Sequence, residues 1–225
     1  MADSTRCVLL FSRKPSEEVA AKGLRRARPL FELAGRRIRD AVALLPDTDL
    51  LIPRQRGGSF GERLANALRD ARALGYRRIV AVPADTPALG ERHLRAAFEA
   101  LESRDVVLGP APDGGVYLIG VGGGVEVEPL LLGVRWRTSA VLRDLLAGAG
   151  AAGAALLPDW LADLDRPADL PGLRVDPALD PILAELIKRV LTAAPTAAPE
   201  AGGPPGRQAL AAPISLRGPP ALLLA

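Results

Sequence analysis

The stretch RIVAVPADTPALGERHLRAAFEAL, Arg78–Leu101, contains the pattern that decides the fold. Its first five residues form a short apolar run rich in branched side chains, which is typical of a buried strand. From Glu91 to Leu101 the apolar residues recur instead at helical spacing. The stretch therefore predicts a strand, a short loop that contains Asp85, and a helix.

The same alternation of strand and helix extends along the chain in both directions. Further strands are predicted at Cys7–Phe11, Asp49–Ile52, Asp105–Gly109, Val116–Val121 and Ala154–Leu157, and further helices at Ala27–Leu45, Phe60–Leu74, Thr138–Ala147 and Pro181–Leu191. The strand segments are nearly continuous apolar runs, which indicates a sheet covered on both faces. We therefore predict an α/β fold, a three-layer α/β/α sandwich with a mainly parallel sheet.

The composition predicts one folded domain and a tail. The chain has 225 residues, of which 48% are hydrophobic and 24% charged, so it can bury a core without disulfides or metals. After Leu191 the sequence becomes mostly Ala, Pro and Gly, a mixture that buries too little apolar surface to fold. We predict a folded domain over residues 6–191 and a disordered tail over residues 192–225.

Cysteine usage and hydropathy predict the cellular location. Cys7 is the single cysteine, which excludes an internal disulfide and favours a reducing compartment. No apolar run approaches the roughly 20 residues that cross a bilayer, and the first residues lack a signal-peptide pattern. A cytoplasmic protein without a membrane partner is expected.

The basic residues are nearly all arginines. The formal net charge is +3, and only Lys14, Lys22 and Lys188 are lysines. Guanidinium groups form forked hydrogen bonds with phosphate, which favours phosphorylated small molecules as ligands. The small net charge and the aromatic content of 4% argue against nucleic acid as a partner. The arginine cluster within residues 25–39 fits a solvated helix face, with a phosphate-facing patch as the alternative.

Three acidic loops follow predicted strands. They contain Asp85, Asp113 and the segment Asp163–Leu170. Open α/β sheets bind ligands beyond the carboxyl ends of their strands, so we expect these loops to meet. Two such aspartates would form an oxygen site for Mg²⁺ or Mn²⁺, an ion that can neutralise a pyrophosphate. Ordinary turn chemistry explains the same residues if they do not meet.

The segment after the first strand, residues 12–26, is predicted to be a basic loop. It contains two of the three lysines but neither a Walker A loop nor a Rossmann fingerprint. Phosphate binding here would rest on side-chain charge, and an exposed loop without a ligand is the alternative. His93 and Cys7 are interpreted as packing residues, since no second histidine or cysteine could complete a zinc site.

Several motifs together resemble a bacterial family of GT-A-fold proteins, long of unknown function, that includes arsenosugar-biosynthesis and radical-SAM-associated glycosyltransferase-like members. The similar stretches are GGSFGERLANAL (Gly57–Leu68), VPADTPALGERHLRAAFEAL (Val82–Leu101), LGPAPDGGVYLIGV (Leu108–Val121), VRWRTSAVLRDLL (Val134–Leu146) and LADLDRPADL (Leu161–Leu170). The resemblance covers about residues 6–170. It implies the fold of the nucleotide-diphosphosugar transferase superfamily.

The resemblance also implies roles for individual residues. It assigns Asp85, Asp163 and Asp165 to a metal, and Asp85 and Asp113 to catalysis, with Asp113 orienting or deprotonating an acceptor hydroxyl. Nucleotide and phosphate binding falls to Ser12, Arg13, Lys22 and Arg63, and substrate binding to Gly114, Gly115, Trp136, Thr138 and Ser139. In the first loop the family's Pro-Gly turn is absent, whereas Lys22 is retained.

The implied function is a metal-assisted transferase with a nucleotide-activated donor. A glycosyltransferase would take a nucleotide-sugar and a small-molecule acceptor, with Mg²⁺ or Mn²⁺ as cofactor. The first alternative is a nucleotidyltransferase that joins an NTP to a phosphorylated small molecule and releases pyrophosphate. The second is a non-catalytic member that binds a ligand or a protein. A homodimer is left open.

Overall fold

The computed structural model describes residues 5–24, 26–150, 153–174 and 179–192. All of these residues belong to one compact unit, Met1–Ala193. Beyond Thr192, the tail predicted to be disordered lies outside the described residues. None of the helices in this described part is both long and apolar enough to cross a membrane.

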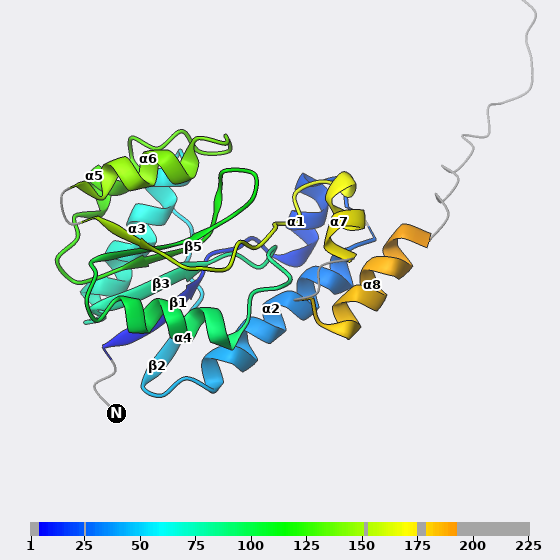
Figure 1. Cartoon of the computed structure of the whole chain (residues 1–225), viewed down its shortest axis with the longest axis horizontal. Helices are drawn as coiled ribbons and strands as arrows, with labels where there is room; N and C mark the ends of the chain where they lie inside the picture. Colours follow the sequence, from blue (N-terminus) through cyan, green and yellow to red (C-terminus); the bar gives the residue numbers. More distant parts are fainter. Residues whose placement is uncertain (1–4, 25, 151–152, 175–178, 193–225) are drawn as a thin grey trace, which may run out of the picture. The chain divides into compact units, whose positions relative to one another are not determined.

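The centre of the unit is a six-stranded sheet with the order β2-β1-β3-β5-β4-β6 (Figure 1). The strands are β1 (Arg6–Leu10), β2 (Thr48–Leu51), β3 (Arg78–Val82), β4 (Val106–Pro110), β5 (Val116–Val121) and β6 (Ala154–Leu156). Only β5 runs antiparallel to its neighbours, β3 and β4. Residues 111–115, which join β4 to β5, are too few for the crossover that a parallel pair needs. The mainly parallel sheet is thus confirmed.

Helices cover both faces of the sheet. On one face α3 (Phe60–Ala73), α5 (Val127–Leu131) and α6 (Val141–Gly148) share a buried cluster with Cys7 and Leu9 of β1. On the other face α2 (Arg28–Ala43) and α4 (Glu91–Ala100) share a second buried cluster with Val8 and Leu10. Successive side chains of a strand point to opposite faces, so one apolar strand supplies both cores. The predicted three-layer sandwich is confirmed.

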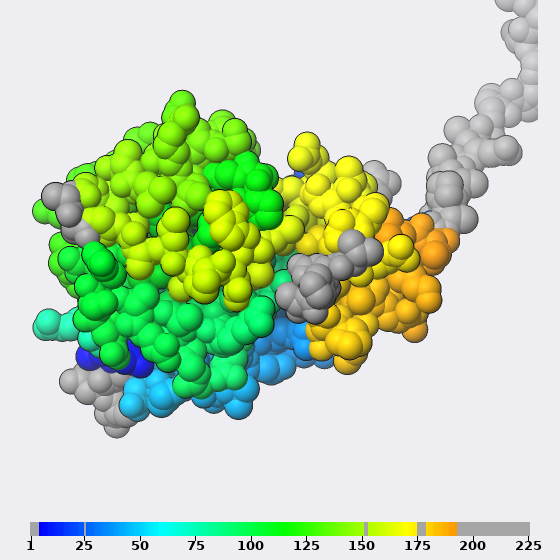
Figure 2. All heavy atoms as spheres, viewed as in Figure 1, coloured from blue at the N-terminus to red at the C-terminus, as the bar shows by residue number. Residues whose placement is uncertain are grey.

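A third buried cluster lies beside the sheet. It joins α1 (Pro15–Ala21), the start of α2, α7 (Leu170–Arg174) and α8 (Pro181–Thr192). A short 3₁₀ helix, Pro167–Asp169, directly precedes α7. Leu164, Leu183 and Ile187 are fully buried in this cluster. Helices α7 and α8, yellow and orange, form part of the surface in Figure 2. The cluster therefore joins the first βα connection to the chain that follows β6.

The predicted elements agree with the structure except in the short helices. Every predicted strand exists, with ends within one residue of those observed. The prediction of a loop at Pro15–Ala21 is wrong, because Pro15 stands at the helix start and Glu17 and Glu18 occupy the first turn. Helix α6 begins at Val141 rather than Thr138, whose hydroxyl accepts a hydrogen bond from the Ala140 N–H in a turn.

Candidate functional site

A cavity of about 650 Å³ is bounded by residues that follow β1, β3 and β6. Phe11–Arg13 follow β1, and Pro83 and Asp85 follow β3. The lining residues beyond β6 are Asp163, Asp165 and Arg166. The turn between β4 and β5 and the segment before α6 complete the wall. The cavity thus lies at the carboxyl ends of the parallel strands, where open α/β sheets bind their ligands.

Nearly all residues singled out in the sequence line this one cavity. They are Ser12, Arg13, Lys22, Arg63, Asp85, Asp113, Gly115, Trp136, Thr138, Ser139, Asp163 and Asp165. Gly114 is not among the lining residues. It has φ +87°, and a Cβ there would stand 2.3 Å from the Ser139 carbonyl oxygen. Gly114 therefore lets the β4–β5 turn pack against the segment before α6. The convergence is structural; the roles assigned above remain predictions.

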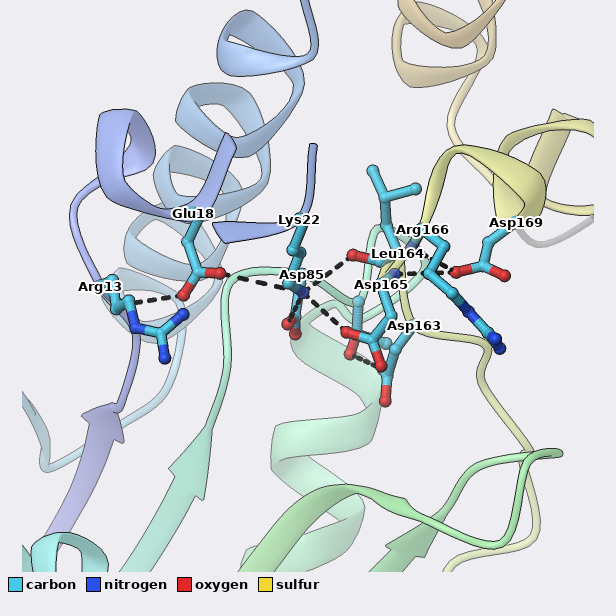
Figure 3. A network of polar contacts seen from close by, with 10 residues as sticks. Arg13, Glu18, Lys22, Asp85, Asp163, Leu164, Asp165, Arg166 and Asp169 are labelled. Atoms are coloured by element: carbon cyan, nitrogen blue, oxygen red, sulfur yellow. Dashed lines mark hydrogen bonds and ion pairs between the residues drawn. The ribbon is translucent and has the colours of Figure 1, made fainter. Parts of the chain in front are cut away.

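Lys22 is the centre of a charged network at one end of the cavity (Figure 3). Its ammonium group forms an ion pair with Asp85 and a second one with Asp165 Oδ1 at 2.8 Å. It also donates a hydrogen bond to the Leu164 carbonyl at 2.8 Å, and Glu18 lies 3.9 Å away. Residues from α1, the β3 loop and the chain after β6 are thereby held together by one cation.

The network favours a charged lysine. Burial lowers the pKa of Lys22, but the negative charges and hydrogen bonds of Asp85 and Asp165 outweigh it, so the pKa is raised above the ordinary value. The lysine side chain is 11% exposed and Asp85 19%, whereas Asp165 is 55% exposed. The pair with Asp85 is therefore the less screened of the two.

Asp163 differs from the other two aspartates. It accepts a hydrogen bond from the Thr86 hydroxyl and does not contact Lys22 among the described contacts. Burial raises the pKa of Asp163 to about 8, and the charge of Asp85 contributes to the rise. Asp163 is consequently mostly a neutral carboxylic acid at pH 7.

The acidic motif after β6 contains a structural aspartate as well. Asp169 Oδ2 accepts hydrogen bonds from the Asp165 N–H at 2.9 Å and the Arg166 N–H at 2.7 Å. This turn presents Asp163 and Asp165 to the cavity. The motif therefore combines the two interpretations that the sequence left open: two aspartates at the cavity and one that caps a turn.

The three predicted metal ligands do not form a metal-binding group in this arrangement. Within residues 5–192, apart from the undescribed gaps, no three His, Cys, Asp or Glu side chains are placed to hold an ion. The Lys22 ammonium lies between Asp85 and Asp165 instead. Their oxygens suit Mg²⁺ or Mn²⁺ chemically, but a resident ion does not fit while the lysine is between them.

Aromatic side chains form a second wall of the cavity. Phe11 and Phe60 are edge to face with centroids 5.6 Å apart, and Phe60 is 4.6 Å from Trp136. Trp136 Nε1 donates to the Leu131 carbonyl at 3.1 Å, which fixes the ring. With Tyr117, four of the eight aromatic residues of the chain line this cavity. The wall gives a ring-shaped ligand an apolar face to contact.

Some lining residues escaped the sequence analysis. Glu18, Gln55, Phe60, Arg137 and Arg166 line the cavity but were not predicted to. Phe60 begins a helix with a capping box, in which the Glu62 N–H donates to Ser59 Oγ at 3.1 Å. That box is a sequence signal which marks Phe60 and Arg63 as the first turn of α3. Glu62, by contrast, has a capping role.

The remaining candidates lie elsewhere. His93 is buried, accepts the Gly90 N–H at Nδ1 and packs edge to face on Tyr117, which confirms a packing role. Cys7 is fully buried, and burial raises the pKa of its thiol to about 12. Of the arginine cluster, Arg28 pairs with Glu32 and Arg37 with Asp180, and no described member lines the cavity. The solvated helix face is the interpretation that agrees with these contacts.

A protein of known structure from Desulfovibrio desulfuricans G20, provisionally named a nucleotide-diphospho-sugar transferase, shares this fold. It is 25% identical over 83% of this chain and 95% of its own, with a TM-score of 0.70. The predicted GT-A-type fold is thereby confirmed. A homologue of Rv0371c from Mycobacterium sp. strain JC1 is 15% identical over 82% of this chain and 98% of its own (TM-score 0.47). Rv0371c of Mycobacterium tuberculosis H37Rv is 16% identical over 75% and 97% (TM-score 0.42).

No curated protein matches the chain. Residues 20–138 match the model of a family described as uncharacterized proteins conserved in bacteria (DUF2064). The matched segment is more than half of the 225 residues and includes Lys22, Asp85 and Asp113. The chain therefore belongs to this bacterial family.

Proposed function

We propose that the chain is a transferase that uses a nucleotide-activated donor, and specifically a glycosyltransferase that moves a sugar from a nucleotide-sugar to a small-molecule acceptor. The observation that carries the proposal is the meeting of Lys22, Asp85, Asp113 and Asp165 in one cavity at the strand ends. The shared fold with a protein provisionally named a nucleotide-diphospho-sugar transferase supports it.

The donor diphosphate would bind at the charged end of the cavity. Lys22 and Arg13 line the cavity and would bind two adjacent phosphates. We propose that Mg²⁺ or Mn²⁺ arrives as part of the nucleotide complex, because phosphate oxygens supply most of the ligands that these ions need. Lys22 would then contact phosphate, while Asp85 and Asp165 face the ion.

Asp113 is the residue proposed to act on the acceptor. Its Oδ1 accepts the Gly115 N–H at 2.8 Å, which fixes the carboxylate in the turn. The other carboxylate oxygen, Oδ2, would take the proton of the acceptor hydroxyl while the acceptor oxygen forms a bond to the sugar carbon. The bond from that carbon to the diphosphate breaks in the same reaction, and the nucleoside diphosphate leaves with the bonding electrons.

A thermal-shift panel tests the proposal. UDP-, GDP-, CDP- and dTDP-sugars and the four NTPs are each added with and without Mg²⁺ or Mn²⁺. A ligand at a hundred times its dissociation constant stabilises the protein by about 2.7 kcal/mol, which a melting curve resolves. We expect one nucleotide-sugar class to raise the Tm, and more so with metal.

Variants locate the binding site in the same panel. D85N and K22A should lose the nucleotide-dependent shift, whereas K14A and D40N, at exposed positions outside the cavity, should keep it. A shift with NTPs alone would instead identify a nucleotidyltransferase. If no nucleotide shifts the Tm of the folded protein, the transferase proposal fails and a non-catalytic binding protein is the remaining interpretation.

Membership of the arsenosugar or radical-SAM-associated branch is a finer proposal, for which arsenical acceptors are the probe.

A further inference from the structure

Arg137 has an unusual backbone conformation for the position it occupies. It lines the cavity with φ +64°. Asp47 is the only other described non-glycine residue with positive φ, and it does not line the cavity. In this left-handed region the Cβ is crowded, and glycine is the residue with least strain. An arginine therefore stands where glycine would satisfy the backbone better.

The chain on both sides of Arg137 is fixed by hydrogen bonds. Trp136 is held by its bond to the Leu131 carbonyl. The Thr138 hydroxyl donates to the Arg135 carbonyl at 2.7 Å and accepts from the Ala140 N–H at 3.2 Å. Arg135 is itself held by two hydrogen bonds from its guanidinium to Asp144. The Arg137 backbone is thus presented to the cavity by a rigid frame.

Two polar side chains of this segment, those of Arg137 and Ser139, have no partner among the described residues. Among the described residues, the Arg137 guanidinium and the Ser139 hydroxyl form no hydrogen bond or ion pair with another residue. Ser139 packs against the turn that carries Asp113, since its carbonyl abuts Gly114. An unpaired guanidinium and an unpaired hydroxyl, two residues apart in the chain, therefore line the same cavity as the proposed acceptor-activating carboxylate.

At the opposite, charged end of the cavity the cation is already used by the fold. There Lys22 is already paired with Asp85 and Asp165. An anionic ligand near Asp113 would be repelled by that carboxylate unless a cation compensated. Arg137 is the guanidinium placed next to the acceptor-side residues to do so.

We propose that Arg137 and Ser139 bind an anionic group of the acceptor. The acceptor is then a small hydroxylated compound that also carries a phosphate monoester or a carboxylate. The guanidinium binds either anion through two parallel N–H bonds, and the acceptor hydroxyl faces Asp113. This inference rests on the proposed function for the identity of the site as an acceptor site, but anion binding itself can be measured without a donor.

Three matched probes test the inference: glycerol, glycerate and glycerol 3-phosphate, at constant ionic strength adjusted with NaCl. They share hydroxyls and differ in the anionic group. Dissociation constants are taken from Tm shifts and from ligand-observed NMR. We expect one or both anionic probes to bind and glycerol not to bind. The stronger anion identifies the source of the charge.

Variants connect this binding to Arg137. R137Q should weaken anion binding about tenfold or more, since it removes a charge-assisted bond. R36Q removes an exposed arginine on α2, outside the cavity, and should leave binding unchanged. R137G relieves the positive φ, so it should lose the anion while its Tm stays at or above that of the wild type.

The outcomes separate this inference from the proposed function. Equal binding of glycerol, unaltered anion affinity in R137Q, or absence of any anion binding would overturn the anionic subsite. Nucleotide-dependent shifts in R137Q equal to those of the wild type show that the donor end is intact. If the anion binds through Arg137 but no nucleotide binds, the subsite is upheld and the transferase function fails.

Discussion

One lysine performs, within the chain, the charge neutralisation that a divalent ion performs in many phosphate sites. The Lys22 ammonium holds Asp85 and Asp165 together although both side chains are acidic. Lys22 and Asp85 are largely buried, so removing the ammonium group would leave an uncompensated charge. The balance of charge at this end of the cavity is therefore set by a single side chain.

Replacing Lys22 should convert the cluster into a metal site. K22A leaves Asp85 and Asp165 without a cation, so the protein should lose about 1–3 kcal/mol of stability in EDTA, toward the low end because Asp165 is exposed. Mg²⁺ or Mn²⁺ alone should then raise the Tm of K22A but not that of K14A or the wild type. Metal-independent melting of K22A would show that Asp85 and Asp165 do not bind an ion in place of the lysine.

Asp163 predicts a pH dependence of stability. Its pKa is raised by burial to about 8, so the folded protein binds a proton that the unfolded chain releases near pH 4. The stabilisation is fully present below the unfolded pKa and is lost as pH rises through the folded pKa. Between pH 4 and 8 the wild type should lose stability relative to D163N, which cannot ionise.

Melting in EDTA from pH 5 to 9 measures this difference. We compare the Tm of D163N minus the Tm of the wild type at the two pH values. This difference should be at least about 2–4 °C larger at pH 8 than at pH 5, which corresponds to about 1 kcal/mol in a chain of this size. D40N, an exposed aspartate on α2, is the control. Parallel pH profiles of wild type and D163N would mean that Asp163 is ionised in the fold.

At the residue scale, the sequence predicted which residues belong to the site better than it predicted their protonation or backbone conformation. Lys22, Asp85 and Asp165 were found because their motifs carry them. The neutral state of Asp163 depends on burial by segments far apart in the chain, and Arg137 on a backbone angle that no local pattern encodes. Such properties follow only from the assembled loops.

At the scale of elements, strength of pattern decided what could be predicted. Strands β3 and β5 were predicted with their observed ends because apolar runs have sharp boundaries. Helices α1, α5 and α7 span five to seven residues, too few for helical periodicity to accumulate. Their stability comes from packing, which the sequence pattern alone does not show.

Helix α3 illustrates how close packing fixes the aromatic wall. A Cβ on Gly61 would lie 2.7 Å from Trp136 Nε1 and 2.9 Å from the Leu131 carbonyl, so G61A must break their hydrogen bond. We expect G61A to cost about 1–3 kcal/mol. Near Gly133 no atom lies within 4 Å of an added Cβ, so G133A should be close to neutral.

Tryptophan fluorescence checks the prediction directly. Measured in a W160F background, where Trp136 is the remaining tryptophan, the emission of G61A should shift to longer wavelength while that of G133A should not. Equal emission and equal Tm for the two variants would mean that α3 can move away from Trp136 at no cost.

At the scale of the whole folded unit, the sheet was predictable and the third core was not. Alternating strands and helices predict a parallel sheet with helices on both faces. Nothing in that pattern brings the chain after β6 back to α1. The structure does so through Leu164, which is fully buried and whose N–H donates to the Asp85 carbonyl at 2.8 Å. The charged cluster therefore depends on a long-range connection.

The last helix should consequently affect the cavity that it does not line. Leu183 of α8 is fully buried in the cluster shared with α1 and α7, whereas the adjacent Ile182 is 64% exposed. L183A should cost about 2–5 kcal/mol and lower the Tm by roughly 5 °C or more, while I182A should have little effect. Because this core supports α1 and Leu164, we also expect L183A to weaken nucleotide binding at a temperature where the variant is folded. Titration with the nucleotide found in the ligand panel measures this affinity. If L183A melts early yet binds as tightly as I182A, the third core stabilises the fold without positioning Lys22.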